Sequence, residues 1–401
     1  MKILQINAVY GVGSTGVIVK ELHELSLNNG IESHVAFSTS KMPVAEIKNG
    51  YKIGTAWGKK LHAVLGRING KQAYFSRFST HKLIHHIRRI KPDIVHLHNL
   101  HSNYIHLNML LKFLAKEKIK TVVTLHDCWF FTGGCYYYTE ANCDRWMFGC
   151  GSCPKKRQDS PAYLLDCSSK IWTDRRKYLG KIDDLTLVGV SRWITAEAER
   201  SGLQAKRFVT VYNGIDTDFF RPTSSGLRKD LGLENKFVVL GMANKWLKPI
   251  NTATLRVVSE GLGEDSALLI VGCSEDVQKK TPSNVIMYGY IHDRNQLRKI
   301  YSMADVFANC TREDALSLVS VEAQSCGTPI VTYRNTGVQE TVDDISSFAV
   351  ENGEPQALLA KIYEIKQNGK QLYAHACREQ ACLKFDRDTN YQEYLNLYKT
   401  I

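Results

Sequence analysis

The chain alternates short apolar, β-branched segments with amphipathic helical segments, and the alternation runs twice. The first series of predicted strands lies at 3–8, 33–37, 93–98 and 121–127, and the second at 237–241, 267–272, 285–289, 304–308 and 329–333. Strand–helix alternation of this kind predicts parallel sheets with helices on both faces. The expected fold class is therefore α/β, with two Rossmann-like doubly wound domains facing across a cleft.

The break between the two series predicts the domain boundary. We assign residues 1–205 to an N-terminal domain and residues 206–384 to a C-terminal domain. An insert at about 128–154 carries four cysteines within the first domain. The amphipathic segment at about 385–401 predicts a last helix, packed either back on the first domain or on the second.

Composition favours a globular protein without membrane spans, since 44% of the 401 residues are hydrophobic and 23% are charged. The longest apolar runs are too short to cross a bilayer, and residues 1–7 are typical of a first strand rather than of a signal peptide. We therefore expect a reducing, cytoplasmic location, where the eleven cysteines do not form a disulfide framework.

The net charge of +12 is unevenly distributed, because residues 1–205 hold 29 Lys and Arg against 16 Asp and Glu. Residues 51–92 hold ten basic side chains and no acidic one, and apolar residues recur there at helical spacing: Trp57, Leu61, Val64, Leu65 and Ile68. Such a helix either lies on an anionic membrane surface or faces the core with a solvated basic side. Nucleic acid is not an expected partner, because no recognition motif accompanies the charge.

Two acidic residues, Asp314 and Glu322, stand eight positions apart around an apolar stretch. This pattern predicts a loop carrying Asp314 at a helix N-terminus, with Glu322 about two turns along the helix. The first backbone N–H groups and the helix dipole favour a phosphate there, and a carboxylate can accept from ribose hydroxyls. The alternative is an ordinary helix with an acidic first turn.

A glycine-rich turn at 11–16 follows the first predicted strand. It serves any strand–helix unit and also occurs in dinucleotide sites. The second strand, which ends near Phe37, has no acidic residue to hold an adenosine ribose, and this counts against a dehydrogenase.

A series of motifs extends over nearly the whole chain. In order they are GSTG (13–16), KPDIVHLHNLH (91–101), TLHDCW (124–129), VS (190–191), NGID (213–216) and the acidic segment. Together they resemble the retaining nucleotide-sugar glycosyltransferases of family 4, which have the two-domain GT-B fold. The insert at 132–154 resembles the branch that builds bacterial surface polysaccharides, including colanic-acid-type transferases.

The resemblance implies catalytic roles for three residues: His126 and Asp314 lie beside the donor sugar, and Glu322 holds the ribose. For His126 the alternative is a structural histidine at a strand end. The implied donor-binding residues are Gly13, Ser14, Lys245, Lys248, Glu313, Ala315, Leu316, Ser317 and Leu318. The implied acceptor-orienting residues are His98, His101 and Asp127, whereas His96 is expected to pack.

This chain departs from the family pattern in its phosphate-binding stretch, residues 241–249. Lys248 matches the family's Lys, but the family's Arg is missing unless Lys245 substitutes for it. Lys is a point charge without the fork of Arg, and Pro249 removes a backbone N–H where the family has Gly. Asp314 also replaces the first Glu of the family's acidic motif.

The insert places Cys135 and Cys143 before a Cys150-x-x-Cys153 pair. Four thiols at such spacing suit a structural zinc ion. Free thiols and disulfides are the alternatives. No cofactor is expected for catalysis itself.

The expected function is metal-independent retaining hexosyl transfer from a nucleotide sugar to a lipid-linked oligosaccharide in surface polysaccharide (O-antigen, capsule or exopolysaccharide) biosynthesis. The expected location is peripheral, on the anionic inner face of the cytoplasmic membrane. One alternative is a GT-B sugar-nucleotide epimerase. The other is a non-catalytic carbohydrate- or nucleotide-sugar-binding protein, since the phosphate-binding stretch is altered.

Overall fold

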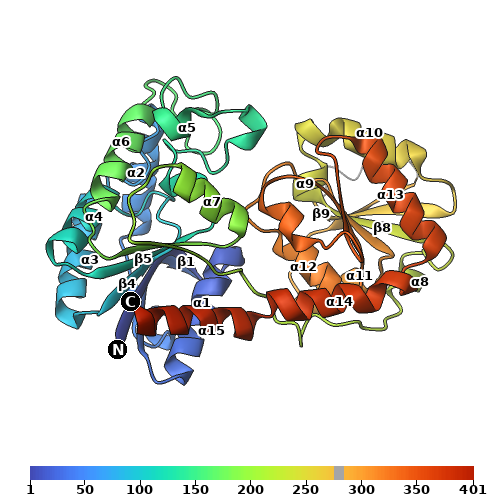
Figure 1. Cartoon of the computed structure of the whole chain (residues 1–401), viewed down its shortest axis with the longest axis horizontal. Coiled ribbons are helices and arrows are strands. Elements are labelled where there is room, and N and C mark those ends of the chain that lie inside the picture. The colour runs from blue at the N-terminus through green and yellow to red at the C-terminus, as the bar shows by residue number, and fades with distance from the viewer. Residues whose placement is uncertain (275–283) are drawn as a thin grey trace. The chain divides into compact units, whose positions relative to one another are not determined.

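The computed structural model describes residues 1–274 and 284–401, which divide into two compact units (Figure 1). The first unit comprises Met1–Val211 together with Tyr391–Ile401, and the second comprises Tyr212–Asn390. Each unit is an α/β structure built on one parallel sheet. The expected fold class of two doubly wound parallel-sheet domains is therefore confirmed.

The first unit contains a seven-stranded parallel sheet in the order β3-β2-β1-β4-β5-β6-β7. Its strands are β1 (Lys2–Tyr10), β2 (Glu32–Ser40), β3 (Gly50–Lys52), β4 (Ile94–Leu97), β5 (Lys120–Leu125), β6 (Leu185–Gly189) and β7 (Arg207–Thr210). Every residue of β4 and β6 is buried, as expected for parallel strands covered on both faces. The strand order reverses between β1 and β4, so a binding crevice is expected at their carboxyl ends.

Helices connect these strands in sequence. They are α1 (Gly13–Asn28), α2 (Ala56–Asn69), α3 (Arg77–Ile90), α4 (Leu107–Lys116), α5 (Arg145–Phe148), α6 (Ser168–Leu179) and α7 (Arg192–Arg200), with short 3-10 turns η1 (Val44–Glu46), η2 (Cys128–Phe130) and η3 (Thr139–Ala141). Side-chain caps begin several of them; the Ser191 hydroxyl, for example, accepts from the backbone N–H of Ile194 at the start of α7.

The second unit contains a six-stranded parallel sheet in the order β10-β9-β8-β11-β12-β13. Its strands are β8 (Phe237–Met242), β9 (Ser266–Cys273), β10 (Val285–Gly289), β11 (Val306–Asn309), β12 (Ile330–Tyr333) and β13 (Phe348–Val350). Its helices are α8 (Leu227–Asp230), α9 (Ala243–Trp246), α10 (Thr252–Gly261), α11 (Arg294–Met303), α12 (Leu318–Ser325), α13 (Pro355–Asn368) and α14 (Gln371–Phe385), with 3-10 turns η4 (Pro249–Asn251) and η6 (Thr336–Thr341). Here the order reverses between β8 and β11.

The last helix, α15 (Arg387–Thr400), contributes the terminal residues of the first unit. The Tyr398 hydroxyl lies 2.6 Å from His96 Nδ1, and the Tyr394 hydroxyl lies 3.0 Å from Thr124 Oγ1. Both partners are buried residues of the central strands β4 and β5. The C-terminal helix therefore packs on the first unit and contacts side chains of β4 and β5.

Helix α2 does not face the core with its apolar residues. Four of the five apolar residues, Trp57, Leu61, Val64 and Ile68, are exposed, and Leu65 is half-buried. The residues that this helix buries are His62 and Gly66. The core-facing interpretation of the amphipathic segment is therefore wrong, because the helix packs through its small and polar side. Within residues 1–274 and 284–401, no helix is both long enough and apolar enough to span a bilayer.

Candidate active site

An ion pair marks the point where the strand order of the second sheet reverses. Strand β8 leads into α9, which carries Lys245, and β11 leads into the loop that carries Asp314. Lys245 Nζ lies 3.2 Å from Asp314 Oδ2. Trp246 Nε1 donates to the Ala308 carbonyl at 2.8 Å and holds α9 against β11. Open α/β sheets bind ligands at this position, so the ion pair identifies a candidate site.

The loop between β11 and α12 is held in an irregular conformation by side-chain hydrogen bonds. Asn309 Nδ2 donates to Ser317 Oγ at 2.9 Å, and the Asp314 N–H donates to Thr336 Oγ1 at 3.1 Å. As a result α12 begins only at Leu318, and Glu322 lies in its second turn. Glu322 is the fifth residue of α12 and so lies only just over one turn from the helix start. The expectation of two turns is wrong, because the loop bonds place the start of the helix at Leu318.

Glu322 is half-buried, and one of its carboxylate oxygens accepts from the Tyr301 hydroxyl at 2.9 Å. Burial raises the pKa of Glu322 to about 7, although the Tyr301 hydrogen bond and the charge of Arg294 oppose the rise. The sequence carries no signal for Tyr301, which lies 21 positions earlier on a different helix. This carboxyl group is thus poised between its neutral and charged forms at neutral pH.

The other expected donor-binding residues of the loop contribute little side chain to any ligand. Glu313, Ala315, Leu316 and Ser317 are buried, and their roles toward a donor stay predictions. Leu318 is half-buried at the first position of α12.

Three basic side chains act on the start of this loop, and one of them, Arg312, belongs to it. Burial raises the pKa of the Cys310 thiol to about 12, and the charges of Arg312, Lys245 and Lys248 oppose this rise. The Arg312 guanidinium donates from Nε to Asn251 Oδ1 at 3.0 Å and lies 4.6 Å from the centre of the Tyr333 ring. Arg312 was not among the expected site residues, because it lies outside the stretch where the family places its Arg. The structure nevertheless brings a guanidinium to this edge of the sheet.

The first unit carries the glycine turn at its own switch point. Gly11 and Gly13 adopt φ angles of +66° and +64°, which favour glycine, and the Gly11 N–H donates to the Gly16 carbonyl at 2.8 Å. Gly13 and Ser14 are exposed at the start of α1, where no side chain caps the helix. The turn therefore leaves a helix N-terminus accessible at the carboxyl end of β1.

Gln5 of β1, His98 after β4 and His126 after β5 form a hydrogen-bonded chain. Gln5 Oε1 lies 3.2 Å from His98 Nε2, and His98 Nδ1 lies 3.2 Å from His126 Nε2. Because an amide oxygen only accepts, His98 Nε2 donates to Gln5 and His98 Nδ1 accepts from His126. Burial lowers the pKa of His126 to about 4 and that of His98 well below its usual range. Both imidazoles are therefore neutral at pH 7, and His126 is the partly exposed end of the chain.

His101 and Asp127 lie at the same edge of the sheet, 3.3 Å apart between His101 Nε2 and Asp127 Oδ2. Asp127 Oδ1 also accepts from the backbone N–H of Trp129 at 2.8 Å and so caps η2. Both residues thus have structural contacts, and their role toward an acceptor stays a prediction. His96 is buried, with its Nε2 2.7 Å from Thr124 Oγ1.

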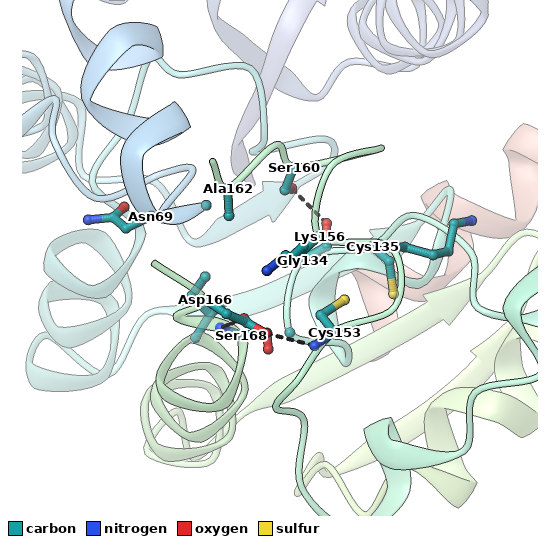
Figure 2. A pocket seen from close by; sticks show the side chains of 13 residues that line it. Asn69, Gly134, Cys135, Cys153, Lys156, Ser160, Ala162, Asp166 and Ser168 are labelled. Atoms are coloured by element: carbon teal, nitrogen blue, oxygen red, sulfur yellow. Dashed lines mark hydrogen bonds between the residues drawn. The ribbon is translucent and has the colours of Figure 1, made fainter. Parts of the chain in front are cut away.

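The four cysteines of the insert line one small cavity of about 20 Å³, which has room for a single water-sized sphere. Figure 2 shows Cys135 and Cys153 at a neighbouring cavity, where the Cys153 N–H donates to Asp166 Oδ2 at 2.7 Å. All eleven cysteines have free sulfurs.

Four thiols are the kind of ligand that a structural zinc ion takes, and all four cysteines line this cavity. However, no three His, Cys, Asp or Glu side chains converge as ligands anywhere in the described part of the chain. Burial raises the pKa of Cys135 to about 12 and that of Cys150 to about 11, so these thiols are protonated without a metal. Zinc binding stays a prediction.

Two doubly wound units with these switch-point sites define a GT-B glycosyltransferase. Residues 15–219 match the family described as Glycosyltransferase Family 4, and residues 234–368 match the family described as Glycosyl transferases group 1. The chain therefore belongs to glycosyltransferase family 4, and it is a glycosyltransferase. The resemblance deduced from the motifs is confirmed.

Two full-length relatives and one solved structure illustrate the similarity. The putative colanic acid biosynthesis glycosyl transferase WcaC of Escherichia coli strain K12 is 23% identical, with 100% of both chains covered. An uncharacterized 41.2 kDa protein in the cps region of Klebsiella pneumoniae is 22% identical over 96% of this chain and 97% of its own. HepE of Anabaena, in complex with UDP and glucose, superposes with a TM-score of 0.67 at 16% identity over 100% of both chains.

Proposed function

We propose that this chain is a retaining hexosyltransferase that moves a hexosyl unit from a nucleotide sugar to an oligosaccharide acceptor during surface polysaccharide biosynthesis. The observation that carries the proposal is the Lys245–Asp314 pair at the switch point of the second sheet, with Glu322 on the helix that follows. The descriptions of two relatives, in colanic acid biosynthesis and in a cps region, support the polysaccharide context.

The donor's diphosphate lies beside Lys245, Lys248 and Arg312 in this proposal. When the bond between the anomeric carbon and the phosphate oxygen breaks, its electron pair stays on the departing nucleoside diphosphate. Fixed positive charges and the N-terminus of α12 stabilise that developing charge. Glu322 accepts from the ribose hydroxyls and so sets the position of the diphosphate relative to these cations.

Asp314 lies beside the sugar, where its carboxylate stabilises the positive charge that develops at the anomeric carbon. The acceptor oxygen bonds to this carbon on the face that the diphosphate leaves, and its proton passes to the departing phosphate oxygen. The configuration is therefore retained. The neutral His126 imidazole offers a hydrogen-bonding partner to a sugar hydroxyl without adding a competing charge.

The proposed acceptor is a lipid-linked oligosaccharide, and the proposed working place is the inner face of the cytoplasmic membrane. The support is the excess of Lys and Arg in residues 1–205, 29 against 16 acidic side chains, which favours an anionic surface. HepE binds UDP and glucose, so a UDP-hexose is the first donor to test.

The test is turnover of UDP-, GDP- and dTDP-sugars by the purified protein, with and without a lipid-linked acceptor. The proposal predicts one preferred donor and a product whose new linkage keeps the donor's anomeric configuration by NMR. It also predicts no stimulation by Mg²⁺ or Mn²⁺, because lysine and arginine side chains neutralise the diphosphate. An inverted linkage, or no turnover of any donor, contradicts it.

A further inference from the structure

The first unit presents an apolar stripe to the outside. Along α2, Trp57, Leu61, Val64 and Ile68 repeat at helical spacing on one face, and Trp57 and Leu61 are 81% and 63% exposed. The opposite face attaches the helix to its unit, since His62 Nδ1 lies 2.7 Å from Ser76 Oγ. Core packing therefore does not account for this stripe.

A second segment extends the apolar surface. The N–H of Tyr163 donates to the Arg67 carbonyl, and the N–H groups of Leu164 and Leu165 donate to the Ile68 carbonyl. These bonds hold three exposed apolar side chains beside the last turn of α2. The residue before this segment also lies by the end of α2: Figure 2 shows Ala162 near Asn69, and both residues line one cavity.

We call the stripe, residues 163–165 and the exposed Phe78 together the α2 apolar patch. It holds eight of the sixteen large apolar side chains that are exposed in the described part of the chain. Exposed apolar residues scattered singly are normal, but a contiguous set of this kind marks an interaction surface.

Basic groups border the patch. Lys60 Nζ lies 5.4 Å from the centre of the Trp57 ring, and Lys82 Nζ lies 4.6 Å from that of Phe78. A pocket of about 480 Å³ opens at Leu61 and Phe78, and Lys52, Arg77 and Lys82 are among the residues that line it. The sequence contains no Asp or Glu between Glu46 and Asp93. The patch therefore combines apolar contact area with a basic segment, residues 47–92, that carries no acidic side chain.

We infer that the α2 apolar patch docks this enzyme on an anionic bilayer, and that a lipid phosphate enters the basic pocket beside it. An apolar helical stripe bordered by Lys and Arg is the pattern of a helix lying in the membrane interface. Trp and Tyr favour that interface, and long basic side chains reach lipid phosphates while their stems stay on apolar surface. Each basic group near an anionic surface adds to the binding.

The patch lies on the same edge of the sheet as the candidate acceptor side chains. Strand β3 ends at Lys52, and Lys59 Nζ donates to Thr39 Oγ1 near the end of β2 at 2.7 Å. His98 and His126 follow β4 and β5 at that carboxyl edge. The docking role rests on the proposed function, since a bilayer here would present a lipid-linked acceptor to this edge.

Vesicle flotation tests the inference with full-length protein and vesicles of phosphatidylcholine, with or without phosphatidylglycerol. We expect the wild type to float with the anionic vesicles only, and less so as salt rises. The double variants Leu61→Glu/Val64→Glu and Lys60→Glu/Lys82→Glu should each lose about tenfold in vesicle partitioning. The matched control Leu372→Glu/Leu383→Glu changes two exposed apolar residues of α14 and should float like the wild type.

Fluorescence provides a second readout that needs no folded variant of the stripe. Trp57 is the exposed one of the six tryptophans, so brominated anionic vesicles should quench its emission in the wild type. The inference is overturned if the wild type ignores anionic vesicles or if the Leu61→Glu/Val64→Glu variant binds them normally. The inference is also overturned if the wild type is a dimer and the Leu61→Glu/Val64→Glu variant is a monomer, because the patch would then bind a second copy of the chain.

A separate assay distinguishes this inference from the proposed function. The patch variants should keep wild-type transfer to a short-chain, water-soluble acceptor, because none of the substituted side chains is among the residues proposed to bind the donor or the sugar. Vesicle binding without turnover of any nucleotide sugar would contradict the proposed function and leave docking intact. Normal turnover without vesicle binding would contradict docking and leave the proposed function intact.

Discussion

Lys245 Nζ and Asp314 Oδ2 lie 3.2 Å apart at the point where the strand order of the second sheet reverses. The pair joins a cation on α9, the short helix that follows β8, to a carboxylate on the loop that follows β11. In the proposed mechanism Lys245 stabilises the negative charge of the departing diphosphate, and Asp314 stabilises the positive charge that develops on the sugar.

Removing the cation should therefore affect catalysis more than folding. We expect Lys245→Ala to lower kcat/KM for the donor about 100-fold, the usual cost of losing one transition-state contact of this kind. Lys245→Arg should stay within about tenfold of wild type, because a guanidinium restores the charge. Steady-state kinetics measures both, with the exposed Lys229→Ala as control. Equal activity of Lys245→Ala and the control would contradict the role.

Glu322 should impose a pH dependence on donor binding. Its pKa is about 7 in the folded protein, so kcat/KM for the donor should rise by up to about tenfold per pH unit below 7 and level off above it. Glu322→Gln should lack this dependence. Tyr301→Phe should shift the rising limb to higher pH, because the Tyr301 hydrogen bond lowers the pKa of Glu322. If kcat/KM of Glu322→Gln rises with pH as in the wild type, the pH dependence belongs to another group.

The same carboxyl group should make stability depend on pH. Its folded pKa exceeds the usual 4.5, so the folded state holds this proton more tightly than the unfolded chain does. The associated stability is complete below 4.5 and is lost as pH rises to about 7. The free energy of unfolding of wild type relative to Glu322→Gln should therefore fall with pH in this window, by at most about 1.4 kcal/mol per unit. Denaturant unfolding at pH 5 and pH 7 checks the difference; a constant difference would contradict it.

The C-terminal helix α15 should help to position the hydrogen-bonded histidines His98 and His126. The Tyr398 hydroxyl bonds to His96, whose ring lies 4.0 Å from that of His98. Tyr398→Phe leaves a buried imidazole nitrogen unpaired and should cost about 1–3 kcal/mol of unfolding free energy. If the helix also positions His98, kcat should fall while KM for the donor stays constant. Lost stability with unchanged kcat would limit α15 to a structural role; the exposed Tyr290→Phe is the control.

The cysteine cavity should bind one zinc ion per chain if the predicted site forms. Elemental analysis should then find one equivalent in the wild type and much less in Cys150→Ser, with Cys382→Ser as the control outside the insert. Removal of the metal by a chelator should unfold the insert, because protonated thiols do not replace metal bonds. A folded, metal-free wild type would contradict the site.

Much of this architecture follows from local sequence signals. The strand at 237–241 is predictable because it is a continuous apolar run, as buried parallel strands usually are. The turn at 11–16 follows from glycine's freedom at positive φ. The edge strands β3 and β13 have three residues each, too few to create a periodic pattern. They form because the neighbouring strand offers its backbone partners.

The candidate site was only partly predictable for a similar reason. Asp314, Glu322 and His126 belong to contiguous motifs, whereas Tyr301, Arg312 and Gln5 act through contacts made by the fold. The direction in which α2 faces was ambiguous from its spacing, because periodicity reveals a stripe without revealing which side is buried. His62 and Gly66 decide the question through packing.

The most direct test of the account is a crystal structure with a nucleotide sugar bound. We expect the diphosphate beside Lys245 and the N-terminus of α12, with the ribose hydroxyls on Glu322. A nucleotide bound away from the carboxyl ends of β8 and β11 would contradict the account.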